Sequence, residues 1–543
     1  MFSFELTGNI VDIRKRQVIS ASIEVRNGII ETITPVEGKY NLFILPGFID
    51  SHVHIESSMI VPSEFARLAV VHGTVATVSD PHEIANVLGI SGVEYMIENG
   101  AKTPFKFNFG APSCVPATSF ETSGATVTAD DIRTLFERRD VRYLSEMMNF
   151  PGVLNNDGMV VEKIKIAKEF NRPIDGHAPG LRGEAARIYS EAGISTDHEC
   201  YTLDEALEKL KYGMKILIRE GSAAKNFEAL HPLLENHSES CMFCSDDKHP
   251  DSLVIGHINE LVQRSVKLGY DVFDVLRVAC LNPVEYYNLE VGQLQVGDSA
   301  DFICVEDLEN FKVLKTYIGG ELVAENGKSL IGQVPVEIIN NFSVKPRLVS
   351  EFRIKAGKGK LRVIEALDGQ LITNEVIADA LVENGEAVSD IAYDILKIAV
   401  VNRYSEAEVS VGFVKGFGLT KGAIASCVAH DSHNIIAVGT SDLELCNAIN
   451  AIIQSEGGIS VVEGHNEDIL PLPVAGIMSS SDGYEVAASY SRLDRKAKEL
   501  GSQLSAPFMT LSFMGLLVIP ALKLSDKGLF DGNNFCFTNI WSE

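Results

Sequence analysis

The chain has 543 residues, which is more than one hydrophobic core usually organises and predicts two or three domains. A hydrophobic content of 45% with 22% charged residues is typical of a soluble globular protein. The net charge of −27 argues against nucleic acid or an anionic membrane as a partner, because either polyanion would repel the chain.

Three further features indicate a cytoplasmic protein. The sequence opens without the basic and then apolar segments of a secretory signal. The longest apolar run near the end, FMGLLVIPAL, is too short to cross a bilayer and is interrupted by Pro520. Nine scattered cysteines, an odd number, indicate reduced thiols rather than a disulfide framework.

The first 45 residues predict short strands, with Asn27 and Gly28 at a hairpin turn. A similar strand-rich pattern returns at residues 291–328. Each piece is too small to bury a core alone, so we expect residues 1–45 and 286–344 to meet in one composite β-sandwich.

Residues 46–285 alternate apolar strand-like runs with amphipathic helical patterns, eight times in succession. Thr128 and Asp131 predict a capping box at the start of one such helix. An open doubly wound sheet is the rival architecture. Eight units without a glycine-rich phosphate turn favour an α/β fold of the (β/α)₈ TIM-like barrel type. Residues 345–543 mix helical and strand patterns and predict an additional C-terminal α/β domain.

Ionisable residues recur where the predicted barrel strands end, which is the rim that carries chemistry in barrels of this kind. The first strand ends with His52 and His54, which share one face because side chains alternate along a strand. The later strand ends carry Asp80, His82 and Glu83 (second), Glu146 (fourth), His177 (fifth), His198 (sixth), Arg219 and Glu220 (seventh), and Asp246 and Asp247 (eighth).

Converging imidazoles and carboxylates suit divalent metals such as Zn, Mn or Fe. The candidate ligands are His52, His54, Glu146, His177, His198 and Asp246. Six ligands are too many for one tetrahedral ion, whereas two ions bridged by a carboxylate would use them all. Taken singly, each histidine also fits a hydrogen-bonded structural group, and Glu146 fits a rim salt bridge. The histidines recur at the same place in the repeating strand–helix unit, and this recurrence favours the metal site.

Two other motifs contain residue types that can bind metal. The stretch AHDSHN contains His430, Asp431 and His433, which suit an extra metal site, a lid over the barrel mouth, or a polar turn between two strands. Cys241 and Cys244 form a C-x-x-C pair, but no proline precedes it and no matching H-x-E motif exists, unlike in zinc deaminases of cytosine. We interpret these cysteines as barrel packing.

The motifs PGFIDSHVHIESSM, SDPHEIANV, EMMNFPGV, DGHAPGL, TDHEC and CSDDKHPD resemble those of the amidohydrolase superfamily, and more closely those of its adenine deaminases. The resemblance covers nearly the whole chain, including a tail similar to the extra C-terminal domain of those enzymes. It implies hydrolytic deamination of adenine to hypoxanthine and ammonia, in purine salvage, by a metal-activated hydroxide at two divalent ions (Mn, Fe or Zn).

The resemblance also implies roles for individual residues. His52, His54 and Asp246 would hold one metal, His177 and His198 the second, and Glu146 would bridge them, since VRYLSEMM offers no lysine for the carboxylated-lysine bridge of many amidohydrolases. Asp246 would act as general base and then general acid. Candidates for the acid that protonates the ring nitrogen N1 are Glu83, Glu184 and Glu220. Residues expected to bind the substrate are Glu56, Asp80, His82 and Arg219.

Adenosine deaminases of the superfamily carry a glutamate three residues after the fifth-strand histidine, where this chain has Gly180, so the free base is the expected substrate. One rival is a cyclic-amide hydrolase similar to hydantoinase or dihydroorotase, against which Glu146 argues. Another is a non-catalytic scaffold with the same fold, which would be expected to have lost ligands. We expect no nucleic-acid or membrane partner, and a homodimer, as is common for large barrels.

Overall fold

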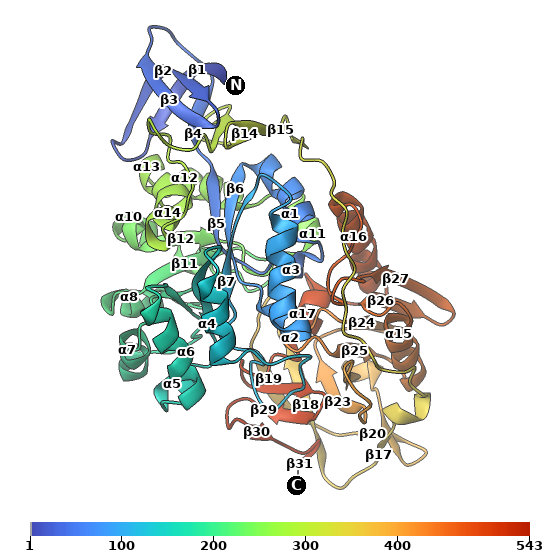
Figure 1. Cartoon of the computed structure of the whole chain (residues 1–543). Helices are drawn as coiled ribbons and strands as arrows, with labels where there is room; N and C mark the ends of the chain where they lie inside the picture. Colours follow the sequence, from blue (N-terminus) through green and yellow to red (C-terminus); the bar gives the residue numbers. More distant parts are fainter. Residues whose placement is uncertain (1–2, 543) are drawn as a thin grey trace.

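The computed structural model describes residues 3–542. Residues 1, 2 and 543, where the predicted first and last domains begin and end, lie outside the described part. Figure 1 shows a small β unit at one end of the molecule, a barrel in the middle, and a C-terminal region beside one end of the barrel. No helix within residues 3–542 has the length and apolar character needed to cross a membrane.

The β unit is one eight-stranded sheet built from both flanking segments, in the order β16-β15-β14-β13-β4-β1-β2-β3. The strands are β1 (Ser3–Asp12), β2 (Gln17–Arg26), β3 (Ile29–Pro35), β4 (Phe43–Pro46), β13 (Phe302–Val305), β14 (Val313–Ile318), β15 (Glu321–Glu325) and β16 (Lys328–Ser329). The segments join where β4 pairs antiparallel with β13. Ile23, Ile44 and Phe302 share one buried cluster, so strands from the two pieces pack together through this sheet.

The central region is the predicted barrel. Its strands are β5 (Phe48–Val53), β6 (Thr74–Ser79), β7 (Lys106–Ala111), β8 (Val141–Met147), β9 (Ile174–Gly176), β10 (Thr196–Asp197), β11 (Lys215–Arg219) and β12 (Cys241–Cys244). They pair in parallel as two arcs, β5 to β9 and β10 to β12. The Ser195 amide donates to the Ile174 carbonyl at 3.0 Å, and the Asp246 amide donates to the His52 carbonyl at 2.9 Å, which joins the arcs on both sides.

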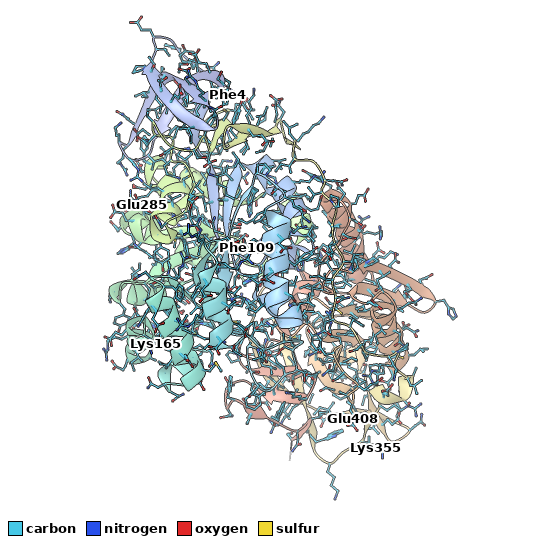
Figure 2. All side chains as sticks on the ribbon, in the orientation of Figure 1. Phe4, Phe109, Lys165, Glu285, Lys355 and Glu408 are labelled. Carbon is cyan, nitrogen blue, oxygen red and sulfur yellow. The ribbon has the colours of Figure 1, made fainter. Side chains whose placement is uncertain are left out.

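Helices surround these strands (Figure 1). They are α1 (Pro62–Ala69), α2 (His82–Leu88), α3 (Ile90–Gly100), α4 (Ala129–Glu137), α5 (Phe150–Leu154), α6 (Gly158–Glu169), α7 (Gly183–Glu191), α8 (Leu203–Lys211), α9 (Phe227–Leu230), α10 (Leu233–Asn236), α11 (Pro250–Leu253), α12 (Ile258–Lys267), α13 (Val272–Leu276) and α14 (Asn282–Tyr287). The capping box predicted at Thr128 and Asp131 opens α4. Phe109, labelled in Figure 2, is buried in β7, whereas the Lys165 side chain on α6 is 74% exposed.

The C-terminal region has a nine-stranded sheet in which β31 is an extra partner of β18. Its main path is β19-β18-β23-β22-β25-β24-β26-β27. Two further three-stranded sheets have the orders β17-β21-β20 and β28-β29-β30. The strands of the whole region are β17 (Ile354–Lys355), β18 (Lys360–Ala366), β19 (Thr373–Ala378), β20 (Leu381–Glu383), β21 (Glu386–Val388), β22 (Leu396–Val401), β23 (Ser410–Lys415), β24 (Ala423–Ser426), β25 (Ile435–Gly439), β26 (Gly458–Glu463), β27 (Asn466–Pro471), β28 (Leu522–Ser525), β29 (Gly528–Asp531), β30 (Cys536–Phe537) and β31 (Trp541–Ser542). The helices are α15 (Asp442–Gln454), α16 (Gly483–Glu499) and α17 (Pro507–Phe513).

The C-terminal region is fixed against the barrel. The segment that leads to it runs along the side of α1 and α3 (Figure 1), where Tyr95 donates its hydroxyl to the Glu337 carbonyl at 3.0 Å. Arg67 of α1 pairs with Asp482, the N-cap residue of α16, at 2.7 Å. One apolar cluster contains buried residues of both parts, among them Phe109 and Leu511. The C-terminal region therefore has a defined position at the barrel, where it covers the carboxyl ends of several strands.

Candidate metal centre

The carboxyl ends of the barrel strands bring the six expected ligand residues into one buried cluster. His52 lies in β5 and Glu146 in β8, while His177 and His198 directly follow β9 and β10. The side chains of this cluster are at most 6% exposed. His54 Nε2 lies 3.2 Å from both His52 Nε2 and Asp246 Oδ1. Two imidazoles and a carboxylate thus face one point.

Glu146 lies between two groups of histidines. Its Oε1 is 3.5 Å from His54 Nε2, whereas its Oε2 is 2.8 Å from His177 Nδ1 and 3.1 Å from His198 Nε2. Burial would raise the pKa of this carboxyl, but His177 and His198 hold it well below its usual range. The carboxylate thus presents one oxygen to each side.

Asp246 is held by Arg219. Arg219 donates to Asp246 Oδ2 at 2.7 Å, while Asp246 Oδ1 faces the first-strand histidines. Burial would raise the pKa of Asp246, but Arg219 and those histidines lower it well below its usual range. The second partner of Arg219 is Glu199, whose carboxylate accepts hydrogen bonds from Nη1 and Nη2 of the guanidinium.

The AHDSHN stretch lies between β24 and β25 and reaches the barrel mouth. His430 Nδ1 lies 2.5 Å from Glu83 Oε1, and His433 Nε2 contacts the other oxygen of that carboxylate. His82 Nε2 lies 3.4 Å from Glu83 and 3.7 Å from Asp431. Burial would raise the pKa of Glu83, but the surrounding histidines hold it well below its usual range.

These side chains enclose a cavity of about 20 Å³. Its polar wall includes the carboxylates of Glu83, Glu146, Glu199, Asp246, Asp247 and Asp431. Its apolar wall consists of Met148 from the barrel and of Leu371, Phe513 and Leu516 from the C-terminal region. A space of this size holds about one water molecule.

Two of the three candidates for the N1 acid lie elsewhere, and this corrects the expectation for them. The Glu184 side chain is 68% exposed on α7 and pairs with Arg187. Glu220 is mostly buried but pairs with Lys225 at 3.5 Å and Arg264 at 3.1 Å, away from the cluster. Spacing along the chain did not separate them from Glu83, because both follow a strand or a ligand histidine closely.

Of the residues expected to bind substrate, only His82 lines the cavity. The other three lie behind its wall. Glu56 accepts the Ile84 amide at 3.1 Å. Asp80 accepts the His82 amide at 3.1 Å and the Glu146 amide at 3.3 Å, so it positions residues of the cluster. Arg219 is engaged with Asp246 and Glu199, as described above.

Sequence reasoning missed Glu199 and the apolar wall. Glu199 directly follows His198 in TDHEC, so its position at the rim was a usable signal. Its Oε1 lies 3.5 Å from both His177 Nδ1 and His198 Nε2. Phe513 and Leu516 carried no comparable signal, because nothing in the local pattern of a distant segment shows which cavity it will cover.

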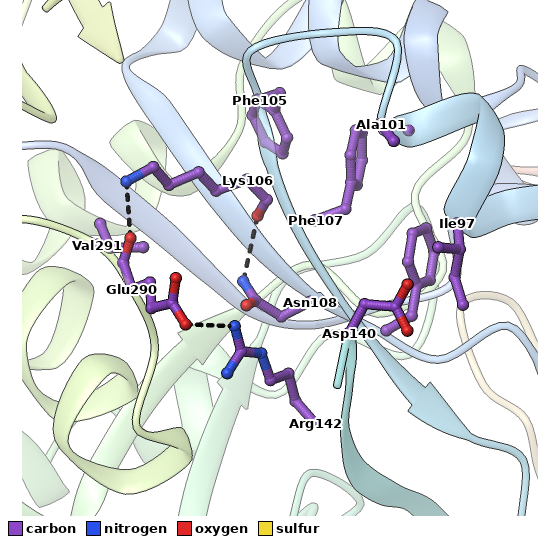
Figure 3. A pocket seen from close by; sticks show the side chains of 12 residues that line it. Ile97, Ala101, Phe105, Lys106, Phe107, Asn108, Asp140, Arg142, Glu290 and Val291 are labelled. Carbon is purple, nitrogen blue, oxygen red and sulfur yellow. Dashed lines mark hydrogen bonds and ion pairs between the residues drawn. The ribbon is translucent and has the colours of Figure 1, made fainter. Parts of the chain in front are cut away.

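A larger hollow of about 300 Å³ lies at the opposite, amino-terminal ends of β7 and β8 (Figure 3). Its charged side chains are paired: Lys106 lies 2.5 Å from Asp301, and Arg142 lies 2.8 Å from Glu290. That end of a barrel generally serves stability. The carboxyl end is therefore the candidate functional site.

The cluster fits divalent cations. Six carboxylates around a small buried cavity would repel one another strongly without compensating positive charge. Within residues 3–542, His177 Nε2 is buried without a hydrogen-bond partner. Imidazole and carboxylate are the ligands that Zn, Mn and Fe take in proteins. Several sets of three or four of these side chains converge closely enough to hold an ion, among them His52, His54 and Asp246.

A barrel with such a cluster at its mouth is characteristic of a metal-dependent hydrolase, and residues 43–323 match the amidohydrolase family. Residues 370–536 match the adenine deaminase C-terminal domain. A protein named adenine deaminase from Sulfurovum sp. (strain NBC37-1) is 57% identical over 534 residues, covering 98% of this chain and 99% of the relative. Adenine deaminases of Salinibacter ruber and Borreliella burgdorferi are 54% and 49% identical, each over 99% of both chains. The chain therefore belongs to the adenine deaminase family of amidohydrolases.

Proposed function

We propose that this protein hydrolyses adenine to hypoxanthine and ammonia, as an enzyme of purine salvage that acts on a C–N bond of a cyclic amidine. The observation that carries this conclusion is similarity over nearly the full length to proteins named adenine deaminase. A cyclic-amide hydrolase is disfavoured because Glu146 stands where those enzymes usually carry a lysine. A scaffold without activity is disfavoured because all six ligand residues are retained in one cluster.

Two divalent ions, Mn, Fe or Zn, would occupy the cluster. His52, His54 and Asp246 would hold one, His177 and His198 the other, and Glu146 would bridge them. The distances of 3.1 to 3.5 Å between several of these ligand atoms support the assignment. Ligands about 2.1 Å from one ion lie about 3.0 to 3.4 Å apart. When bound, such ions make water acidic enough to attack near neutral pH and offset negative charge in the transition state.

The residues of the chain would move two protons. Glu83, which is ionised at rest, would accept the first proton of the attacking water and deliver it to N1 as C6 becomes tetrahedral. Asp246 would accept the second proton from the new hydroxyl group and pass it to the amine at C6. Ammonia then leaves as the C6–O double bond of hypoxanthine forms. Water and adenine thus account for every atom of the products.

The pairing partners support these roles. Arg219 holds Asp246 Oδ2 at 2.7 Å, which leaves Oδ1 directed at the cluster. The two histidines of the AHDSHN stretch hold both oxygens of Glu83 at the cavity wall.

We also propose a cytoplasmic homodimer. The location rests on the cysteine content and the dimer on the general tendency of large barrels to pair.

Ammonia release from adenine by the purified protein, reconstituted with Mn, Fe or Zn, tests the proposal. Adenosine, guanine and dihydroorotate are assayed in parallel. We expect turnover of adenine and its loss, by about 10³-fold or more, on Asp246→Asn. Binding of two metals without turnover of adenine would contradict the substrate assignment and leave the metal assignment intact.

A further inference from the structure

The two walls of the cavity come from different parts of the chain. Barrel strands supply the ligand cluster, whereas three of the four apolar side chains, Leu371, Phe513 and Leu516, come from the C-terminal region. Phe513 and Leu516 are at most 4% exposed, and Leu371 packs against the same apolar cluster. No step of the reaction described above uses these side chains.

The chemistry of a purine suits such a wall. The ring is flat with two apolar faces, and its polar atoms lie on the edge, so a site binds it by apolar contact on the faces and hydrogen bonds at the rim. C6 and N9 lie on opposite sides of the bicycle. When C6 faces the ligand cluster, N9 therefore faces away from it, toward the groups that cover the barrel mouth.

We propose that Leu371, Phe513 and Leu516, here called the roof, bind the purine ring and exclude any substituent at N9. This inference rests on the proposed function and adds a specificity role for the C-terminal region. Asp431 lies in the polar part of the cavity wall, 3.7 Å from His82 Nε2, so the apolar roof is left to face the N9 side of the ring. The C-terminal region, rather than the barrel, thus selects the free base over its nucleoside.

The roof is held in place from behind. Lys523 of β28 is fully buried, and its Nζ donates to the Leu371 carbonyl at 2.6 Å and to the Phe513 carbonyl at 2.9 Å. One buried side chain thus joins two roof residues that are far apart in the sequence. The Phe513 ring also stacks on His430, with 5.3 Å between ring centroids. Such supports fix a wall that has to discriminate between ligands of similar shape.

A larger cavity lies next to the one at the ligand cluster. The neighbouring cavity has a volume of about 610 Å³ and is lined by Phe120, Phe150, Val518 and Pro520 among others. Met148 lines both cavities. Since the cavity at the ligand cluster holds only about one water, a purine ring fits there only when side chains around it shift. Contacts between roof side chains would then be replaced by contacts with the purine ring.

The roof is tested with Leu516→Ala and Phe513→Ala in the metal-loaded, full-length enzyme, using adenine, 9-methyladenine and adenosine. The matched control is Phe508→Ala, which truncates another buried phenylalanine of α17 that packs on Tyr490 instead. We expect wild type and the control to reject 9-methyladenine. For the roof variants we expect a KM for adenine raised about tenfold, kcat within about threefold, unchanged metal content, and measurable turnover of 9-methyladenine.

The outcomes separate the two proposals. If wild type does not deaminate adenine, the proposed function fails whatever the variants do. If wild type is active and folded Leu516→Ala keeps its KM and still rejects 9-methyladenine, the roof is not the specificity wall. Equal effects of Phe508→Ala and Phe513→Ala would likewise overturn the roof, because they would show a general loss of packing. Thermal unfolding and metal content identify variants that fail to fold, and Leu516→Ala, the milder truncation, then decides.

Discussion

The barrel and the C-terminal region contribute different kinds of side chain to the site. The barrel half gathers charged and polar groups, which satisfy one another: Arg219 pairs with Asp246 and Glu199, and Glu146 lies between two sets of histidines. The C-terminal half contributes three apolar side chains, the Asp431 carboxylate, and two histidines that hold Glu83. In the two proposals above, the barrel performs the chemistry while the C-terminal region selects and orients the substrate.

The same difference predicts how each half responds to mutation. Removing one charge from a buried, mutually paired cluster leaves other charges uncompensated, so the cost is large and extends to metal binding. Removing apolar surface or a supporting hydrogen bond from the other half changes affinity or orientation and leaves the cluster in place. The following variants test this contrast.

The largest effect is expected for Glu146→Gln. A neutral amide is a poor bridge between two cations, so we expect bound metal to fall from two ions per chain to one or fewer, and activity to fall by about 10³-fold or more. Elemental analysis and ammonia release measure both. Glu184→Gln is the matched control, because Glu184 pairs with Arg187 on the surface. Full metal content and activity in Glu146→Gln would show that the carboxylate is not a ligand.

Glu83→Gln is expected to lower kcat by about 10²-fold with metal content unchanged, because the amide cannot carry a proton to N1. Single-substrate kinetics and elemental analysis check the two quantities. Glu220→Gln is the control at the next candidate position, since its partners are Lys225 and Arg264. A larger loss in Glu220→Gln than in Glu83→Gln would reverse the assignment.

The contrast also explains what the sequence could predict. The barrel repeats one local pattern, so strand ends and their histidines were readable from periodicity, and the strands do bring His52, His177 and His198 together. Glu184 and Glu220 could not be rejected beforehand, because a helix or a side-chain rotation decides where a carboxylate points. The contact of Phe513 with the cavity depends on packing between distant segments, which no local pattern encodes.

A moderate effect is expected for His433→Ala, which removes one of the two groups that hold Glu83. His433 acts as a positioning residue, so we expect kcat to fall about tenfold, KM for adenine to change little, and metal content to stay at the wild-type level. His433→Gln, which retains a side-chain donor, should recover part of the loss. His465→Ala is the control, because His465 is exposed in the same region. An effect on KM alone would assign His433 to substrate binding instead.

The smallest effect on catalysis, and a distinct one on stability, is expected for Lys523→Met behind the roof. Burial lowers the pKa of Lys523 from its usual 10.5 to about 7. Between pH 7 and 10.5 the unfolded chain therefore binds more protons at this residue than the folded chain, and wild-type stability gains from this group as pH rises. Lys523→Met lacks that contribution. We compare the free energies of unfolding of wild type and variant. The wild-type value minus the variant value should increase by up to about 1.4 kcal/mol per pH unit in this window and level off below pH 7.

Denaturant unfolding at pH 7, 8 and 9 measures this difference. The control is Lys527→Met, which replaces an exposed lysine of the turn that follows β28 and should show no such dependence on pH. A difference independent of pH would mean that Lys523 stays charged in its buried site, held by the Leu371 and Phe513 carbonyls alone.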